Sequence, residues 1–437
     1  MKTTFRSPFA TRGALLIRNA QHPTQTLINA ALIILATVII THRCSASTNY
    51  VAHEWGTFTS VQGSNGNLLP WRPIQLSELP KFVYSSKIAG SELLVKPSLI
   101  TYQRLETPVI YFYSQDAMKV TADVRFPQGL ITEWFPNVSE TSTGHSITNG
   151  TNITYVQEGH AVWRDIDILG AHQDGGLPRD TVGSHYFAAR ATDANLIRAT
   201  TTNATELEKF IFYRGAGNFK TPLRVTVDGN NVVSVENTGD QPLAHLFLLN
   251  IHDGTGAFAM LDELTSSNSV RWQSLNDTAE HWNRFDLARF QTELGAQVQI
   301  ALTSAGLNPD EAQAMVNTWR DSWFTEDGVR VLYLLPRQWT DGILPLTLTP
   351  QPTELTRVMV GRAEVITPQV ETRLFQLLSA AQAGDTDAKT KAVSEFKHLG
   401  RFSEPALQLA LSHTNYTSLV NFSYQLLRPP QPDSIFE

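Results

Sequence analysis

The chain has 437 residues, of which 42% are hydrophobic and 17% charged, so it can build one large core or two to three domains. Its formal net charge is −7, with 34 basic and 41 acidic side chains. A nucleic-acid-binding surface needs clustered Lys and Arg to displace counterions, and this balance excludes nucleic acid as an expected partner.

The first 46 residues have the layout of an export signal. Their charges are all positive, and an apolar run over residues 27–40 precedes the small residues that end at Ala46. That run is about 14 residues long, which suits the apolar segment of a signal peptide and falls short of the ~20 residues that span a bilayer. We therefore expect a signal peptide over residues 1–46 and a periplasmic or extracellular protein. The alternative is a signal that stays uncut, with residues 27–40 as a membrane anchor.

Cleavage after Ala46 would leave an acidic, cysteine-free mature chain. It removes five of the 34 basic residues and no acidic ones, which leaves 29 against 41 and a net charge near −12. The single cysteine, Cys44, lies before the cut. Thiol catalysis, disulfides and zinc-cysteine sites are therefore not expected in the mature protein.

Residues 47–285 read as a β-rich domain. Residues 119–126 alternate apolar and polar side chains, as a half-buried strand does. Residues 223–227 and 232–235 flank Asp228-Gly229-Asn230-Asn231, which predicts a hairpin. Further strands are expected over 109–113, 209–213 and 243–251, and the Ser, Thr and Asn of 140–154 predict a surface loop. The expected class is α+β, predominantly antiparallel β, as a sandwich or barrel.

Helices are expected in two later regions. Residues 286–328 predict an inserted helical hairpin, whose second helix begins with Asn308 as N-cap, Pro309 at the first position and Glu311 at the third. Strands over 329–335 and 355–360 would complete the β-rich domain within 329–367, with extended chain between Pro336 and Pro352. Residues 368–437 predict a C-terminal helical region, with segments near 370–383, 388–399 and 404–412.

The densest motif is His53-Glu54-Trp55-Gly56-Thr57-Phe58-Thr59-Ser60-Val61. Together with the sequence segments 106–113, 208–215, 318–324 and 344–346, this motif makes the chain resemble a family of exported bacterial proteins with an N-terminal HEWGTFTSV motif. The resemblance covers about residues 51–367 and implies export. It brings no established activity.

His53 and Glu54 offer a general base and acid, or two ligands of a metal site completed elsewhere. In a strand the two side chains point to opposite faces, so one site would not use both directly. The structural alternative is that they fix the N-terminal strand.

A second cluster runs from Ser184 to Asp193 and contains His185, Tyr186 and Arg190. As a strand it would place His185 on one face, and Tyr186 and Arg190 on the other. A divalent-metal site built from His53, His185 and either His160 or His172, with Asp174 nearby, has no diagnostic spacing. A lone histidine among aromatic residues is more often structural.

Two further features suggest binding. Trp55 follows Glu54 as Trp134 follows Glu133, and tryptophan faces stack on sugars while carboxylate pairs hydrolyse them. Tyr213 and Arg214 precede a Gly-rich turn and offer a guanidinium group to an anion. The structural alternatives are ordinary strand residues and a strand end.

The chain has no nucleophile-elbow, P-loop, dinucleotide-binding or EF-hand motif. The leading hypothesis is an exported binding or interaction protein. The alternative is an extracytoplasmic hydrolase, metal-assisted or carbohydrate-directed, that uses His53, Glu54 and His185. A third hypothesis is an interaction scaffold that docks through the helices after Pro368.

Overall fold

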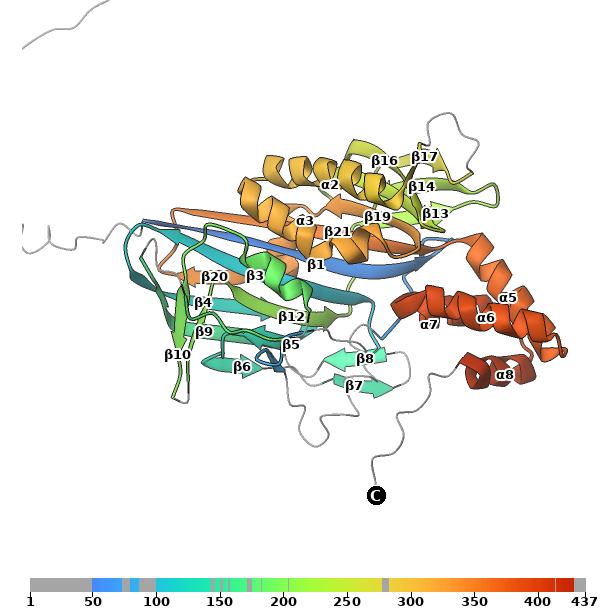
Figure 1. Ribbon diagram of the computed structural model, residues 1–437, viewed down its shortest axis with the longest axis horizontal. Coiled ribbons are helices and arrows are strands. Elements are labelled where there is room, and N and C mark those ends of the chain that lie inside the picture. Colours follow the sequence, from blue (N-terminus) through green and yellow to red (C-terminus); the bar gives the residue numbers. More distant parts are fainter. Residues whose placement is uncertain are drawn as a thin grey trace, which may run out of the picture. The chain divides into compact units, whose positions relative to one another are not determined.

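The computed structural model describes residues 49–72, 79–85, 100–142, 146–149, 152–155, 158–170, 175–181, 183–202, 204–276, 283–412 and 414–427 (Figure 1). Residues 49–437 form one compact unit. The expected signal peptide with Cys44, and the candidate ligands His172 and Asp174, lie outside the described residues.

A ten-stranded sheet runs through the described unit in the order β18-β16-β15-β19-β21-β1-β3-β12-β5-β2. Strand β1 is central, and it pairs in parallel with β21 and antiparallel with β3. The other pairs in this sheet are antiparallel. The strands are β1 (Tyr50–Gly63), β2 (Tyr84–Ser85), β3 (Gln103–Ser114), β5 (Gly129–Phe135), β12 (Ile211–Gly217), β15 (Leu243–His252), β16 (Thr255–Leu264), β18 (Arg284–Asp286), β19 (Gly328–Leu334) and β21 (Glu354–Ile366).

Three smaller sheets accompany it. The first has the order β11-β10-β9-β4-β20 with β6 beside β9, the second is β13-β14-β17, and the third is the pair β7-β8. Their strands are β4 (Met118–Phe126), β6 (Glu140–Ser142), β7 (Ser146–Asn149), β8 (Asn152–Tyr155), β9 (Gly159–Ile168), β10 (Ile197–Thr200), β11 (Thr205–Glu208), β13 (Leu223–Val227), β14 (Val232–Asn237), β17 (Ser269–Ser274) and β20 (Leu346–Thr349). Every described sheet is open-ended, so the architecture is sandwich-like rather than a closed barrel.

Two hydrophobic clusters cover the two faces of the ten-stranded sheet. On β1, Ala52 and Phe58 join the cluster that also contains the inward residues of β4, β9, β13 and β14. Trp55 joins the opposite cluster, which packs against helices α2 (Leu287–Ser304) and α3 (Pro309–Phe324) and the 3₁₀ helix η2 (His185–Arg190). The alternation of side chains along β1 therefore separates a sheet-facing core from a helix-facing core.

The expected α+β class and most of the expected elements are confirmed. The alternating residues 119–126 lie in β4, and residues 223–227 and 232–235 form the hairpin β13-β14. Helix α3 begins as predicted: Glu311 completes a capping box with Asn308, and Pro309 is the first helical residue. The apolar stripe that contains Trp319 and Trp323 packs into the helix-facing core.

Two expectations of loop or extended chain were wrong. The stretch 140–154, expected to be a loop, contains β6, β7 and part of β8. The proline-rich stretch 336–352, expected to be extended chain, contains a short helix, α4 (Arg337–Ile343), before strand β20; Pro336 keeps an extended backbone at the N-cap position and the helix begins after it. His185 and its neighbours form η2, in which the Ser184 side chain caps the Tyr186 backbone N–H, so the two faces that a strand would give them do not apply.

The C-terminal helices gather beyond the end of β1 and β21 (Figure 1). They are α5 (Pro368–Gln382), α6 (Thr386–His398), η3 (Gly400–Phe402), α7 (Ser403–Leu411) and α8 (Thr417–Leu427). Phe402 and Leu374 pack with Val61 and Ile366 of the sheet, while a separate cluster holds the helices to one another. The C-terminal region is therefore joined to the sheet through part of its own core. No helix in the described residues is both long and apolar enough to cross a membrane.

Candidate functional site

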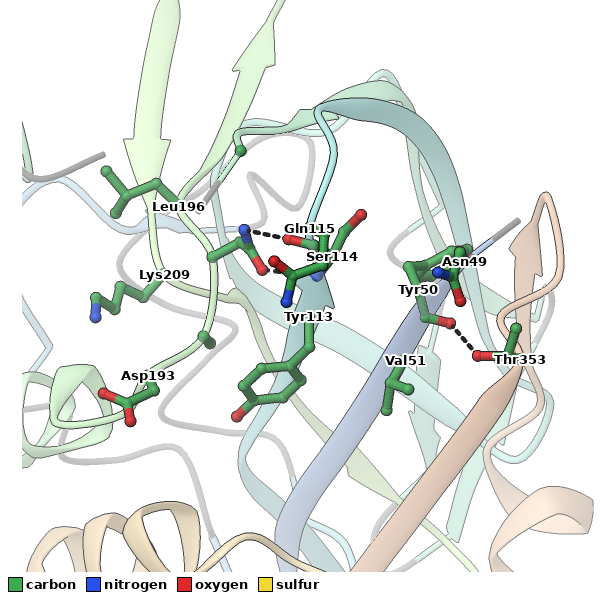
Figure 2. Close-up of a pocket in the computed structure, with 13 residues that line it drawn as sticks. Asn49, Tyr50, Val51, Tyr113, Ser114, Gln115, Asp193, Leu196, Lys209 and Thr353 are labelled. Atoms are coloured by element: carbon green, nitrogen blue, oxygen red, sulfur yellow. Dashed lines mark hydrogen bonds between the residues drawn. The ribbon is translucent and has the colours of Figure 1, made fainter. Parts of the chain in front are cut away.

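A cavity of about 620 Å³ opens where β1 begins and β3 ends (Figure 2). Figure 2 shows Tyr113 between two walls, with Asp193, Lys209 and Leu196 on one side and Val51 and its neighbours on the other. The described lining residues are Asn49, Tyr50, Val51, Tyr113, Ser114, Gln115, Gly170, Asp193, Ala194, Asn195, Leu196, Lys209 and Thr353. We call this cavity the Tyr113 pocket. Its volume falls within the roughly 300–1,000 Å³ typical of small-molecule sites.

Hydrogen bonds fix one wall of the Tyr113 pocket. The Asn195 side chain donates to the carbonyls of Ser114 (3.0 Å) and Leu169 (2.7 Å), and it accepts from the Ser114 N–H at 2.8 Å. Lys209 Nζ donates to the carbonyl of Thr192 at 2.6 Å. The polar side of the pocket is thus held in place before any ligand arrives.

Tyr113 connects the pocket to His53 through a buried glutamate. Its hydroxyl donates to Glu311 Oε1 at 2.6 Å, and His53 Nδ1 lies 2.8 Å from Glu311 Oε2. Burial and the Glu311 carboxylate raise the pKa of Tyr113 far above its ordinary value, so the phenol stays protonated. Glu311 also accepts the Asn308 backbone N–H at 2.8 Å. One carboxylate therefore caps α3, orients His53 and holds the pocket tyrosine.

Glu54 lies on the other face of β1, as the strand period predicts. Arg357 Nε donates to Glu54 Oε2 and the Tyr213 hydroxyl donates to Glu54 Oε1, both at 2.5 Å. The Glu54 side chain is fully buried and that of Arg357 is 1% exposed. Burial and the Glu54 charge raise the pKa of Tyr213 well above 10. His53 and Glu54 therefore do not share a site.

His185 contacts a third group of residues. Arg214 Nη2 lies 2.6 Å from His185 Nε2, and because arginine only donates, Nε2 accepts and the ring proton sits on Nδ1. The His185 ring packs against Trp319 with centroids 5.4 Å apart. Burial and then the Arg214 charge lower the pKa of His185 to about 3, so it is neutral at physiological pH.

The structure does not gather His53, Glu54 and His185 around one point. His53 and His185 contact α3 at Glu311 and Trp319, eight residues or about 12 Å apart along the helix. His160 has a different partner, Glu140, at 3.3 Å. Within the described residues no three His, Cys, Asp or Glu side chains are placed to hold a metal ion together.

The remaining candidate binding residues are packed into the core. Arg190 donates to Glu208 at 2.6 Å, and its guanidinium lies 5.5 Å from the Tyr186 ring centroid. Tyr186 is fully buried and donates to the same Glu208 at 2.9 Å. Trp55 is also fully buried, and its ring lies against Tyr111. Among the five candidates, the buried Trp55 Nε1 and Arg214 Nε have no hydrogen-bond partner in the described residues, and only Arg214 of these two carries a charge.

An arginine cluster on the helix-facing side of the sheet was not predicted from the sequence. Arg330 donates to Glu364 at 3.0 Å and to the Trp323 carbonyl at 2.9 Å, and Arg362 donates to Glu364 at 2.8 Å and to the Ser322 hydroxyl at 2.6 Å. The two guanidinium groups thus satisfy carbonyls at the end of α3 that have no partner within the helix. The sequence signal was a charged pair, Arg362 and Glu364, inside the otherwise uncharged stretch 358–366 of β21.

The same cluster ties the C-terminal helices to the sheet. Arg401 of η3 donates to Glu106 of β3 at 2.5 Å, and Arg104 lies 3.1 Å from the same carboxylate. Burial alone would raise the pKa of Glu106, but Arg401 and Arg104 outweigh it and hold that pKa at about 2. The Thr59 hydroxyl donates to its second oxygen at 3.0 Å.

Comparison with protein-family models and with curated proteins gives no match to this chain.

Proposed function

We propose that the chain is an exported binding protein for a small, uncharged or zwitterionic polar molecule, with the Tyr113 pocket as its ligand site. The observation that carries the proposal is the pocket itself, whose volume fits a small molecule and whose polar wall is fixed by hydrogen bonds. A prearranged wall favours binding because little side-chain entropy is lost when the ligand enters.

The lining chemistry sets the ligand class. Tyr113, Ser114, Gln115 and other neutral groups provide hydroxyls and amides, and the two charged lining residues, Asp193 and Lys209, cancel. A ligand with a large net charge would find no matching excess charge in this lining. A polyhydroxylated or zwitterionic molecule would find both donors and acceptors.

Binding is tested by calorimetry with three sets of probes: neutral monosaccharides, zwitterionic amino acids and dicarboxylates. We expect saturable binding from one of the first two sets. Val51→Trp fills the pocket and should weaken that binding at least tenfold. The matched control is Val393→Trp, at an exposed valine of α6, which should leave affinity unchanged. Equal affinity of Val51→Trp and the wild type, or no binding by either probe set, would rule out the Tyr113 pocket as the proposed site.

Export is tested on the same chain. The positively charged start, the apolar run 27–40 and the small residues before Ser47 support cleavage after Ala46. Protein recovered outside the cytoplasm of an expressing bacterium should begin at Ser47 by N-terminal sequencing. Intact protein that stays in the cytoplasm would contradict export, and intact protein in the membrane would favour the uncut anchor.

A further inference from the structure

Arg214 sits where the ten-stranded sheet loses its regular pairing. The register of β1 against β3 shifts between Trp55 and Thr57, and that of β12 shifts against both neighbours at Arg214. On β3 the backbone of Thr107 adopts φ 46°, a conformation that costs a β-branched residue energy. Irregularities of this kind turn a side chain out of the regular pattern and are frequent beside binding sites.

The donors of Arg214 are only partly used. Its Nη2 reaches Thr107 Oγ1 at 3.3 Å and His185 Nε2 at 2.6 Å, while the buried Nε has no hydrogen-bond acceptor among the described residues. The Arg214 residue is 3% exposed. Glu133 is its register partner on β5, and Glu133 Oε2 also accepts from the Thr132 hydroxyl at 2.5 Å. A buried guanidinium N–H without an acceptor is costly, and an incoming acceptor would relieve that cost.

Trp319 has a second hydrogen-bond donor, the buried Nε1, without an acceptor among the described residues, and its ring lies against His185, which contacts Arg214. His185 itself is neutral, and with Nε2 accepting from Arg214 its Nδ1–H is a donor. The site therefore presents donors, whereas an ordinary buried polar network balances donors with acceptors.

The charged side chains around Arg214 carry a net positive charge. In the described part of the chain, this side of the sheet brings together five arginines and four glutamates: Arg104, Arg214, Arg330, Arg362, Arg401, Glu106, Glu133, Glu326 and Glu364. Arg330 and Arg362 are paired with Glu364 and Glu326, and Arg401 with Glu106. Arg104 and Arg214 remain beside Glu133 and leave one positive charge in excess.

We propose that this site binds a small oxyanion, such as a carboxylate, phosphate or sulfate group, through the unpartnered N–H of Arg214 with Trp319 as a second donor. Guanidinium groups bind such anions through charge-assisted hydrogen bonds, which are about twice as strong as neutral ones. The site is separate from the Tyr113 pocket, because Thr107 and Tyr113 lie six residues, or about 20 Å, apart on β3. The inference therefore does not depend on the proposed function. The competing occupant is ordered water.

The test is calorimetric titration of the purified protein with inorganic phosphate, sulfate and acetate in turn at low ionic strength. We expect saturable one-to-one binding of at least one probe, and the tightest probe identifies the class of oxyanion. Arg214→Gln should weaken that binding at least tenfold. The matched control is Arg224→Gln, at a surface arginine paired with Glu236, which should bind as the wild type does.

A second variant covers the case in which Arg214→Gln fails to fold. Trp319→Phe keeps an aromatic ring against His185 but removes the indole N–H together with one of the two fused rings. It should fold with some loss of stability and bind several-fold more weakly. Failure of all three probes to bind the wild type, or unchanged affinity in Trp319→Phe and in folded Arg214→Gln, would overturn the proposal and assign the free donors to water. Equal weakening in Arg224→Gln would show non-specific attraction and would also overturn it.

Discussion

Replacing Arg357 with methionine should destabilise the protein by about 4 kcal/mol. Arg357 donates to Glu54 at 2.5 Å, to Asp341 at 2.7 Å and to the Leu344 carbonyl at 2.7 Å, and both members of the Glu54 pair are buried. Methionine has similar length but no charge, so Glu54 would keep only the Tyr213 hydroxyl. Removing one member of a buried ion pair costs about 3–5 kcal/mol, because the other charge stays desolvated.

The corresponding change in melting temperature follows from the size of the unit. Roughly 390 residues at about 2.1 cal/mol/K each give an unfolding entropy near 0.8 kcal/mol/K, so ~4 kcal/mol lowers Tm by about 5 °C. The measurement is urea unfolding followed by tryptophan fluorescence, with calorimetry for Tm. Asp341→Asn is the control: this partner's side chain is 44% exposed, so its loss should cost under about 1 kcal/mol.

A double variant separates the buried charge from the lost packing. Glu54→Gln combined with Arg357→Met removes both charges of this pair and should be at least ~1.5 kcal/mol more stable than Arg357→Met alone. If Arg357→Met cost less than about 1 kcal/mol, or if the double variant were no more stable than Arg357→Met, the assignment of this pair as a fully desolvated core interaction would be refuted.

Two further predictions concern pH and the C-terminal helices. The pKa of His185 falls from 6.5 to about 3 on folding, so the unfolded chain binds this proton first as pH drops. Stability should therefore fall as pH drops from 6.5 toward 3, by up to about 1.4 kcal/mol per pH unit from this group. His185→Gln should flatten that slope and His252→Gln, at an exposed histidine, should not; identical slopes in the wild type and His185→Gln would contradict the buried neutral imidazole. Arg401→Met removes one of the cations beside buried Glu106 and should cost ~2 kcal/mol in urea unfolding. Arg373→Met, at an exposed arginine of the same region, should cost under about 1 kcal/mol. Equal costs would mean that Arg401 does not tie this region to the sheet.

The sequence predicted local structure better than long-range partners. The start of α3 was readable because Asn308, Pro309 and Glu311 act within one helical turn. The second role of Glu311, as the partner of His53 across 258 positions, follows from the packing of α3 on the sheet and has no local signal. The helical turn at His185 was not predicted, although the side chain of Ser184, one residue before it, provides the cap.

In the candidate sites, too, local features were predictable and long-range contacts were not. The opposite orientation of His53 and Glu54 was predictable from the period of a strand. Arg214 was singled out as well, but the Gly-rich turn expected after it is wrong, because residues 215–217 continue strand β12. The contact of Arg214 with His185 was not predictable, because it depends on the register shifts of β12 against β3 and β5. The Tyr113 pocket combines residues from the beginning of β1, the end of β3 and the chain after β9, and no motif connects them.

The parallel pairing of β1 with β21 has a consequence for the order of folding. Val51 at the start of the described unit pairs with Glu354, about 300 positions later, and the two strands lie side by side in the middle of the sheet. The central strand therefore has no partner on that side until almost the whole chain has been synthesised, and closing so long a loop is intrinsically slow. Late completion of the central sheet would suit a chain that crosses a secretion channel unfolded, which is the route that the proposed signal peptide would require.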